Sequence, residues 1–227
     1  GSGKSTTRAE MIDATNKTKR SHIITLEDPI EFVHRSELSL VNQREVFAHT
    51  KSFARALKAA LREDPDIVLV GEMRDLETIQ LALETANTGH LVFGTLHTST
   101  AISTVDRIID VFPPAQQAQV RAVLADVLKG VVSQALCKKI GGGRSAALET
   151  LVVNYAIANL IREGKTHQVQ SAMTTSKALG NSLLNEALAA LVADGKVEYA
   201  EALAKSVDKA DLARRCNKPA PSATAAA

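Results

Sequence analysis

The sequence predicts an α/β protein with a largely parallel central sheet, followed by a small C-terminal helical region. Short apolar runs alternate along the chain with stretches of helical spacing, which is the pattern of strands joined by crossover helices. Gly-Lys-Ser near the start is the end of a phosphate-binding loop motif, and such a loop joins a strand to a helix. With 45% hydrophobic and 23% charged residues among 227, the composition is that of a globular protein and excludes global disorder.

The first element is a loop followed by a helix. The chain opens with Gly1-Ser2-Gly3-Lys4-Ser5-Thr6. Its first five positions fit the end of the pattern G-x-x-x-x-G-K-[ST]. The first glycine and the strand before it are missing from the sequence, so we expect a fragment cut inside the loop, with weak or no activity by itself. A flexible Gly-Ser linker is the alternative, but residues 5–17 follow without a helix breaker and predict a helix.

The next elements are a strand, an extended segment and a helix. The apolar run 22–26 predicts a buried parallel strand, which Glu27-Asp28-Pro29 closes. Residues 31–46 predict extended or hairpin structure. Thr50 is the expected N-cap of a helix that runs to about Arg62.

Two more pairs of strand and helix follow. Residues 66–70 predict a second buried strand, which ends at Gly71-Glu72, and residues 76–87 predict a helix. Residues 91–96 predict a third strand, and residues 100–111 predict the helix after it.

A long helix is expected after Pro113-Pro114, because proline suits the first turn of a helix. Apolar residues at spacings of three and one predict its core face: Val120, Val123, Leu124, Val127, Leu128, Val131 and Val132. Segments 132–140 and 146–153 then predict two strands joined by a glycine-rich turn. No Gly-Lys-Ser follows these glycines, so a hairpin turn is favoured over a second phosphate loop.

The remainder of the chain predicts short helices and a tail. Residues 154–215 have helical spacing in short pieces, and 219–227 are rich in Ala, Pro, Ser and Thr, which predicts disorder. We therefore expect a core at 1–153, a helical region at 154–215 and a disordered tail at 216–227.

Charge, aromatic content and cysteines exclude several classes of protein. The 27 Lys and Arg nearly balance 25 Asp and Glu, and aromatic residues are 3%, so neither a basic nucleic-acid surface nor stacking platforms are expected. Cys137 and Cys216 are too few for a disulfide framework or a four-cysteine zinc site. No apolar run approaches the ~20 residues that span a bilayer, and no signal-like start is present, so the cytoplasm is the expected compartment.

Polar side chains follow each of the three predicted strands. Glu27 and Asp28, with Glu31 just beyond, follow the first strand, Glu72 follows the second, and His97 follows the third. Ligands of parallel sheets bind at the carboxyl ends of the strands. We therefore expect these groups to converge on the phosphate-binding loop.

The loop predicts binding of a nucleoside triphosphate with Mg²⁺, so ATP and Mg²⁺ are the expected cofactors. Glycines let successive N–H groups point at phosphate oxygens, and the N-terminus of the next helix adds a positive field. Lys4 is expected to reach the β- and γ-phosphates, and Ser5 to ligate Mg²⁺. Glu72 is expected to help hold Mg²⁺ directly or through water; the alternative is a solvated charge at a strand end.

Hydrolysis needs a group that orients or deprotonates the attacking water, and Glu31 or Glu27 could serve. The alternative is that one of these carboxylates pairs with Arg35 or Arg44 on the surface. His97 is expected to hydrogen-bond the γ-phosphate and report its presence, although a lone histidine is often structural.

Five segments then carry a resemblance: residues 27–32, 42–46, 61–66, 71–75 and 88–98. They read Glu-Asp-Pro-Ile-Glu-Phe, Asn-Gln-Arg-Glu-Val, Leu-Arg-Glu-Asp-Pro-Asp, Gly-Glu-Met-Arg-Asp, and Thr-Gly-His through to His-Thr. In this order they resemble the secretion ATPase superfamily, and within it most closely the PilT family, the motors that retract type IV pili. The resemblance covers roughly residues 1–163.

The resemblance implies a RecA-like P-loop NTPase core, a ring-shaped homohexamer and an N-terminal PAS-like domain outside this sequence. It implies that Glu31 is the catalytic carboxylate of the Asp box and Glu72 the Walker B glutamate. It places His90 and His97 in the His box. It also implies an inner-membrane pilus platform protein as partner, and so a cytoplasmic protein held peripherally at the inner membrane.

Residues 156–163 resemble the family's retraction motif, Ala-Ile-Arg-Asn-Leu-Ile-Arg-Glu. Ala158 replaces the first arginine, which leaves Arg162 as the matching cation; a simple packing helix is the alternative. Extension motors and type II secretion motors usually carry a four-cysteine zinc element, so two cysteines favour the retraction branch and no zinc. Arg74 and Arg107 are candidates for phosphate or interface contacts.

The sequence therefore predicts a Mg²⁺-dependent ATPase that powers type IV pilus retraction and twitching motility. One alternative is an extension or type II secretion ATPase of the same superfamily. A nucleic-acid translocase on the same core would need a basic groove or aromatic platforms. A nucleotide-binding regulatory subunit without turnover would be expected to lack the carboxylates of Glu31 and Glu72.

Overall fold

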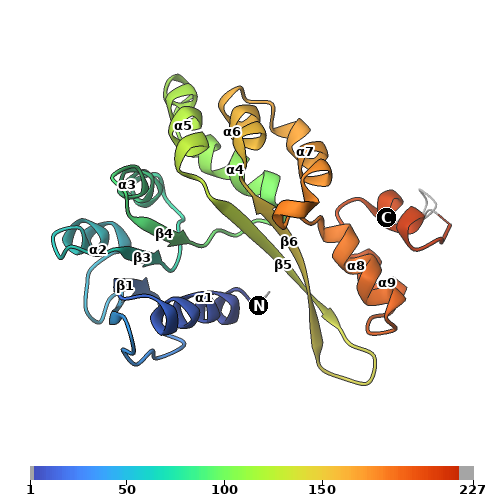
Figure 1. Cartoon of the computed structure of the whole chain (residues 1–227), viewed down its shortest axis with the longest axis horizontal. Helices are drawn as coiled ribbons and strands as arrows, with labels where there is room; N and C mark the ends of the chain where they lie inside the picture. Colours follow the sequence, from blue (N-terminus) through green and yellow to red (C-terminus); the bar gives the residue numbers. More distant parts are fainter. Residues whose placement is uncertain (1–2, 220–227) are drawn as a thin grey trace. The chain divides into compact units, whose positions relative to one another are not determined.

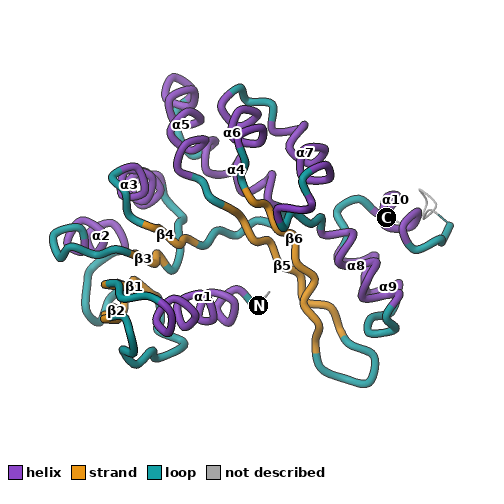
Figure 2. Tube along the Cα trace, viewed as in Figure 1, coloured by secondary structure: helices purple, strands orange, loops and turns teal. Residues whose placement is uncertain are grey.

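The computed structural model describes residues 3–219, in which the chain forms two compact units (Figures 1 and 2). The sheet unit comprises Lys4–His97 and Asp106–Leu128. The hairpin unit comprises Gly3, Thr98–Val105 and the described residues from Lys129 onward. Predicted features at Gly1, Ser2 and 220–227 lie outside the described residues, and the predicted domain bounds at 153 and 215 stay a prediction.

The sheet unit is built on four parallel strands: β1 (His22–Glu27), β2 (Leu40–Glu45), β3 (Ile67–Val70) and β4 (Leu91–Gly94). Their order is β2-β1-β3-β4. β1 and β3 are the central strands, and they are the two whose side chains are almost all buried. This is why their sequences are continuous apolar runs rather than alternating ones.

Helices cover both faces of this sheet. On one face, Ile12 of α1 (Lys4–Thr18) packs with Ile23 and Leu69. On the other face, Leu57 of α2 (Phe53–Ala60) and Ala82 of α3 (Leu76–Asn87) lie in one cluster with the strand residues Ile24, Leu26, Val68 and Val70. Neighbouring strand residues point to opposite faces, so each central strand supplies both clusters. Helix α5 (Pro114–Val127) lies beside α3, and α4 spans Ala101–Asp110.

The hairpin unit is built on two antiparallel strands, β5 (Gly130–Lys138) and β6 (Arg144–Val152), which confirms the predicted glycine-rich hairpin. Five short α-helices follow: α6 (Tyr155–Arg162), α7 (Val169–Thr175), α8 (Leu184–Ala193), α9 (Tyr199–Lys205) and α10 (Lys209–Arg215). Cys137 is buried in a core cluster with Leu188 and Leu212, and burial raises the pKa of its thiol. Buried Glu149 accepts hydrogen bonds from the first N–H groups of α4 and α8, those of Ala101 and Leu184.

Of the two alternatives predicted for residues 31–46, extended or hairpin structure, the extended one is confirmed at Leu40–Glu45: β2 runs parallel to β1 and forms no hairpin with it. Buried Asn16 of α1 explains the direction. Its side chain donates to Arg35 O (2.7 Å) and accepts from Glu37 N (3.0 Å). These bonds bring the chain back to the amino end of β1, where Leu40 pairs with His22. The two strands therefore begin at the same end of the sheet and run in the same direction.

Three predicted boundaries also differ. Helix α5 ends at Val127, and Val131 and Val132 belong to β5, because pairing with β6 takes over from Gly130 onward. Ser52 rather than Thr50 is the N-cap of α2, and its hydroxyl accepts from Arg55 N. The paired part of β4 ends at Gly94, three residues before His97. Within residues 3–219, no helix is both long and apolar enough to cross a bilayer.

Candidate nucleotide-phosphate site

The N-terminus of α1 forms one wall of the site. Gly3 has a φ of 85°, a left-handed conformation that glycine adopts without strain, and the helix begins at Lys4. No acidic side chain lies in the first turn, where the leading N–H groups of a helix have no intrahelical acceptor and can bind an anion. Ser5 is partly buried and Thr6 is exposed in this turn.

Lys4 reaches across to the segment after β4. Its ammonium donates to Leu96 O (3.0 Å) and lies 3.2 Å from Nδ1 of His97. The other imidazole nitrogen, Nε2, lies 2.7 Å from Glu72 Oε1. Because an ammonium can only donate, Nδ1 acts as acceptor in this arrangement, so Nε2 carries the proton and donates to Glu72. Lys4, His97 and Glu72 therefore form one hydrogen-bonded chain, as the convergence of strand ends predicts.

Glu72 is placed by the glycine before it. Gly71 N donates to Leu26 O (2.7 Å), and a Cβ at Gly71 would lie only 2.8 Å from that oxygen. Only glycine lets the end of β3 approach β1 this closely. The hydrogen bond from Arg74, helped by that from His97, holds the pKa of Glu72 below its ordinary value, although partial burial opposes the shift. Glu72 is thus a carboxylate at neutral pH.

Glu31 lies beside the start of α1. Ser5 Oγ donates to Glu31 Oε1 at 2.9 Å, and the Glu31 side chain is otherwise exposed. The turn that leads to Glu31 is fastened to β2, because Ile30 N donates to Glu45 Oε2 (3.0 Å). The hydroxyl predicted to ligate Mg²⁺ and the carboxylate predicted to act on water are therefore direct neighbours.

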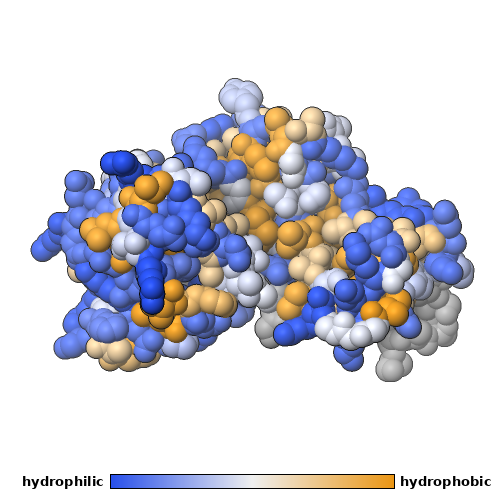
Figure 3. All heavy atoms as spheres, turned by 60° about the horizontal axis from the view of Figure 1, so that its bottom comes forward, coloured by the Kyte–Doolittle hydropathy of each residue, from blue (hydrophilic) through white to orange (hydrophobic). Residues whose placement is uncertain are grey.

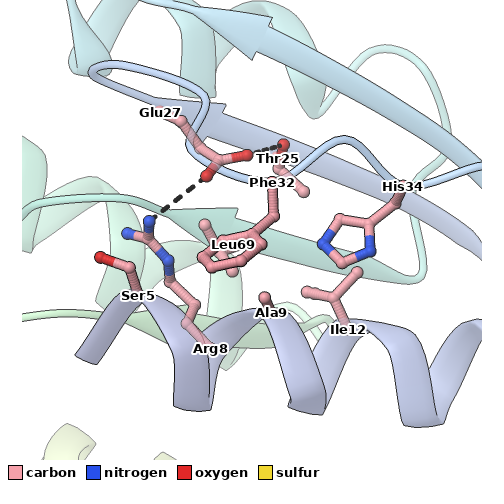
Figure 4. Close-up of a pocket in the computed structure, with 9 residues that line it drawn as sticks. All are labelled: Ser5, Arg8, Ala9, Ile12, Thr25, Glu27, Phe32, His34 and Leu69. Carbon is pink, nitrogen blue, oxygen red and sulfur yellow. Dashed lines mark hydrogen bonds and ion pairs between the residues drawn. The ribbon is translucent and has the colours of Figure 1, made fainter. Parts of the chain in front are cut away.

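Glu27 is in a different situation from Glu31, because it is 6% exposed and fully engaged. Arg8 Nη2 lies 3.3 Å from Glu27 Oε2, and Thr25 Oγ1 donates to Oε1 at 2.8 Å (Figure 4). Gln43 Nε2 donates to the same oxygen at 3.0 Å. The carboxylate borders a small cavity of about 10 Å³ between α1 and the sheet, room for roughly one water molecule. These contacts favour Glu31 over Glu27 as the group that acts on water.

Neither carboxylate pairs with the arginines that the sequence suggested. Arg44 forms its ion pair with Glu63 (2.6 Å), and the cation beside Glu27 is Arg8. Sequence reasoning missed Arg8. The available signal was its position, because residues four apart on a helix share a face and Arg8 follows Lys4 by that distance.

Three predicted residues remain: His90, Arg107 and Arg162. His90 precedes β4 and so lies at the amino end of that strand, whereas the site lies at the carboxyl ends. Its Nδ1 lies 3.1 Å from Thr85 O. Arg107 is exposed in the last turn of α4. Arg162 belongs to the hairpin unit, and its Nη1 lies 3.5 Å from Asn159 Oδ1 of the same helix. Roles for these three residues stay predictions.

The site's donors and acceptors fit a magnesium nucleotide. An ammonium and a free helix N-terminus match phosphate oxygens, and a hydroxyl with nearby carboxylates matches the oxygen ligands that Mg²⁺ prefers. Within residues 3–219, no group of three or more His, Cys, Asp or Glu forms a ready-made metal site. Mg²⁺ does not require one, because one or two carboxylates, phosphate oxygens and water complete its shell.

Comparison with known proteins assigns the fold to a family. A model of the type II/IV secretion system proteins matches residues 1–204. The chain belongs to this family. The family match covers the whole sheet unit and all the site residues discussed above.

Individual members of the type II/IV secretion system family are highly similar to the chain. The type IV pilus retraction ATPase PilT of Pseudomonas aeruginosa is 58% identical over 206 residues, which are 91% of this chain and 60% of that protein. A twitching motility protein of Neisseria gonorrhoeae is 56% identical over 198 residues, 87% of this chain and 53% of that protein. The chain thus spans between half and two thirds of the length of these relatives.

A solved structure of this family is also similar. The crystal structure of the pilus retraction motor PilT with bound ADP matches with a TM-score of 0.89 and 56% sequence identity. The match covers 94% of this chain and 61% of that one. It confirms the predicted α/β fold of RecA-like type with a parallel central sheet.

Proposed function

We propose that the chain is the ATP-hydrolysing part of a Mg²⁺-dependent motor that powers type IV pilus retraction and twitching motility. The observation that carries the proposal is the double link at the N-terminus of α1: Lys4 to His97 and Glu72 on one side, and Ser5 to Glu31 on the other. The similarity to the pilus retraction ATPase and to the twitching motility protein supports the biological role.

Nucleotide binding follows from the positive charge of Lys4 and of the N-terminus of α1. The N–H groups of the first turn of α1 and the Lys4 ammonium bind the phosphates. The present partners of Lys4 are a carbonyl and an imidazole, which a phosphate oxygen would outcompete because it carries negative charge. Ser5 and Glu72 would hold Mg²⁺, which when bound neutralises charge on the phosphates. The ADP in the related PilT structure supports a nucleotide as ligand.

Hydrolysis follows from Glu31 and His97. Glu31 orients a water molecule toward the γ-phosphorus and accepts its proton as the water attacks, while ADP departs. Glu31 is exposed and accepts one hydrogen bond from Ser5, so it keeps acceptor capacity for water. His97 joins Lys4 to Glu72 and thus changes partners when a γ-phosphate draws Lys4 away, which lets it report the nucleotide state.

The proposal includes assembly as a homohexamer and coupling to an inner-membrane platform protein. Large apolar side chains are exposed along one stretch of the sheet unit: Phe32, Val33, Leu38, Leu40 and Phe47. This stretch includes the edge strand β2, and exposed apolar edges are typical of interfaces. Arg74 and Arg107, both exposed, are candidates for contacts with neighbouring subunits. The retraction motif with Arg162 on α6 is the candidate contact for force transmission.

The test is Glu31→Gln in the full-length protein. Glutamine keeps the shape and a hydrogen bond to Ser5 but cannot accept the proton, so steady-state ATP hydrolysis should fall to near background while a fluorescent ATP analogue still binds. Glu37→Gln, an exposed carboxylate in the same segment, is the matched control and should hydrolyse normally.

Two outcomes would contradict the proposal. Unchanged turnover in Glu31→Gln removes Glu31 from the reaction, and an unsubstituted protein that binds ATP without turnover is a regulatory subunit. A strain that lacks its retraction ATPase distinguishes the biological role: the unsubstituted protein should restore twitching, whereas an extension or secretion ATPase would not.

A further inference from the structure

The guanidinium of Arg8 contacts the ends of two strands at once. Nη1 donates to Gly71 O (3.1 Å) at the end of β3, and Nη2 pairs with Glu27 Oε2 (3.3 Å) at the end of β1. Arg8 itself lies on α1, one turn after Lys4 and three residues after Ser5. One side chain therefore joins α1 to the ends of β1 and β3. Figure 4 shows its ion pair with Glu27.

These contacts are largely shielded from water. The side chains of Arg8 and Glu27 are 14% and 7% exposed. The Glu27 carboxylate also accepts from Thr25 and Gln43, so its oxygens have three donors in all. A buried ion pair is costly to form unless every polar atom is satisfied, and it holds its geometry firmly when they are.

The residues that Arg8 contacts stand shortly before Glu31 and Glu72 in the sequence. Gly71 precedes Glu72, and Glu27 begins the five-residue segment that ends at Glu31. Glu31 and Glu72 therefore follow strand ends that the guanidinium of Arg8 joins to α1. A shift of about 1 Å in a reacting group can cost about a hundredfold in rate without any loss of ligand affinity.

We propose that Arg8 is a positioning residue for ATP hydrolysis: through Glu27 and Gly71 O it fixes Glu31 and Glu72 relative to Lys4 and Ser5. The inference rests on the proposed function. Arg8 bonds to Glu27 and to Gly71 O rather than to Glu31 or Lys4, so we expect it to affect the rate of ATP turnover rather than nucleotide binding. The planar guanidinium of Arg8 presents two nitrogens, one to the Glu27 carboxylate and one to Gly71 O. The single ammonium of a lysine could not serve both equally well.

The test uses Arg8→Gln, Glu27→Gln and the double variant in the full-length protein. Nucleotide sites are counted by titration with a fluorescent ATP analogue, so that unfolded molecules do not lower the measured kcat. We expect Arg8→Gln to lower kcat per site by about 10- to 100-fold, with the analogue's Kd within about threefold of the parent. The double variant should be no slower than the slower single variant, because the pair acts as a unit. Arg8→Lys should recover part of the rate.

Arg44→Gln is the matched control, since it breaks another Arg–Glu pair of the sheet unit, that of Arg44 with Glu63 at 2.6 Å. It should leave kcat within about twofold of the parent. The proposal is overturned if Arg8→Gln also keeps kcat within this range, or if the two single losses multiply in the double variant. If Arg8→Gln does not fold, Glu27→Gln and Arg8→Lys carry the same test with smaller changes of shape.

Failure of this inference is distinguishable from failure of the proposed function. If Glu31→Gln abolishes turnover and Arg8→Gln does not lower it, Arg8 alone loses its role. If Glu31→Gln leaves turnover unchanged, the assignment of the reaction itself is wrong.

Discussion

At the scale of residues, the site is a set of hydrogen bonds that a nucleotide would rearrange. Lys4 lies between a carbonyl and an imidazole, and both are neutral acceptors in this arrangement. Its positive charge is thus still available to a phosphate, for which charge-assisted hydrogen bonds are stronger. Glu72 is held by His97 and Arg74, and Glu31 by Ser5, so each carboxylate already has a defined orientation.

Glu72 gives a prediction about pH. The pKa of its carboxyl is lowered chiefly by the hydrogen bond from Arg74, and a depressed pKa contributes stability that is present above the ordinary value of 4.5 and is lost as pH falls through the folded value. Arg74→Gln should therefore move the pKa of Glu72 back toward its ordinary value. The contribution to stability is small, because the Arg74 side chain is 75% exposed and solvent screens the pair.

The measurement is a carboxyl-carbon NMR titration of Glu72 in the parent and in Arg74→Gln. Arg62→Gln, an exposed arginine elsewhere in the sheet unit, is the control and should leave the titration unchanged. An identical Glu72 titration in the parent and in Arg74→Gln would show that Arg74 does not interact with this carboxylate in solution.

The sequence predicted five of these residues together: Lys4, Ser5, Glu31, Glu72 and His97. It could do so because each one follows a strand or the loop, and the ends of parallel strands meet at one edge. The residue pattern alone could not separate Glu27 from Glu31, which only the family resemblance distinguished, because burial and the presence of Arg8 are consequences of packing. The position of Arg8, four residues after Lys4, was the one local signal for it, and its pairing with Glu27 could not be read from the sequence.

At the scale of elements, the close approach of β1 and β3 is the feature that sets the site. Central strand residues are buried on both faces, and the carboxyl ends are in register, with Leu26 paired to Val70 and Val70 to Gly94. The apolar character of β1 and β3 could be anticipated from the sequence, whereas the order of the strands in the sheet was not predicted. The parallel direction of β2 could not be anticipated. It depends on Asn16, a polar residue of α1 that is itself fully buried.

Gly71→Ala tests this close approach. The added Cβ would meet Leu26 O at 2.8 Å and Glu27 Cα at 3.1 Å, and both are backbone atoms that can move only if the strands separate. We expect the free energy of unfolding to fall by about 1–3 kcal/mol and ATP turnover to fall with it. Thermal and urea unfolding with a steady-state ATPase assay measure both effects.

Gly94→Ala is the matched control, since Gly94 ends the neighbouring strand. The three atoms nearest its added Cβ all belong to the side chain of Met73, a flexible thioether that can move aside. The loss of stability should therefore be smaller than at Gly71. Equal losses in the two variants would mean that the β1–β3 backbone contact does not govern the site.

At the scale of the whole molecule, the proposed chemistry and the proposed coupling lie in different units. Lys4, Ser5, Glu31, Glu72 and His97 all belong to the sheet unit, whereas the segment that resembles the retraction motif lies in the hairpin unit. The chain changes unit directly after His97, so the residue proposed to sense the γ-phosphate adjoins the hairpin unit in sequence.

On the face drawn in Figure 3, hydrophilic residues predominate and apolar ones gather in separate patches.

A crystal structure of the full-length protein with Mg²⁺ and a non-hydrolysable ATP analogue tests the central claim most directly. The account predicts the β- and γ-phosphates at the N-terminus of α1, with Lys4 Nζ moved from Leu96 O to a phosphate oxygen. It also predicts that Ser5 Oγ and the carboxylate of Glu31 or Glu72 face the metal and the γ-phosphate. Phosphates bound elsewhere on the chain, with Lys4 still on Leu96 O, would contradict the account.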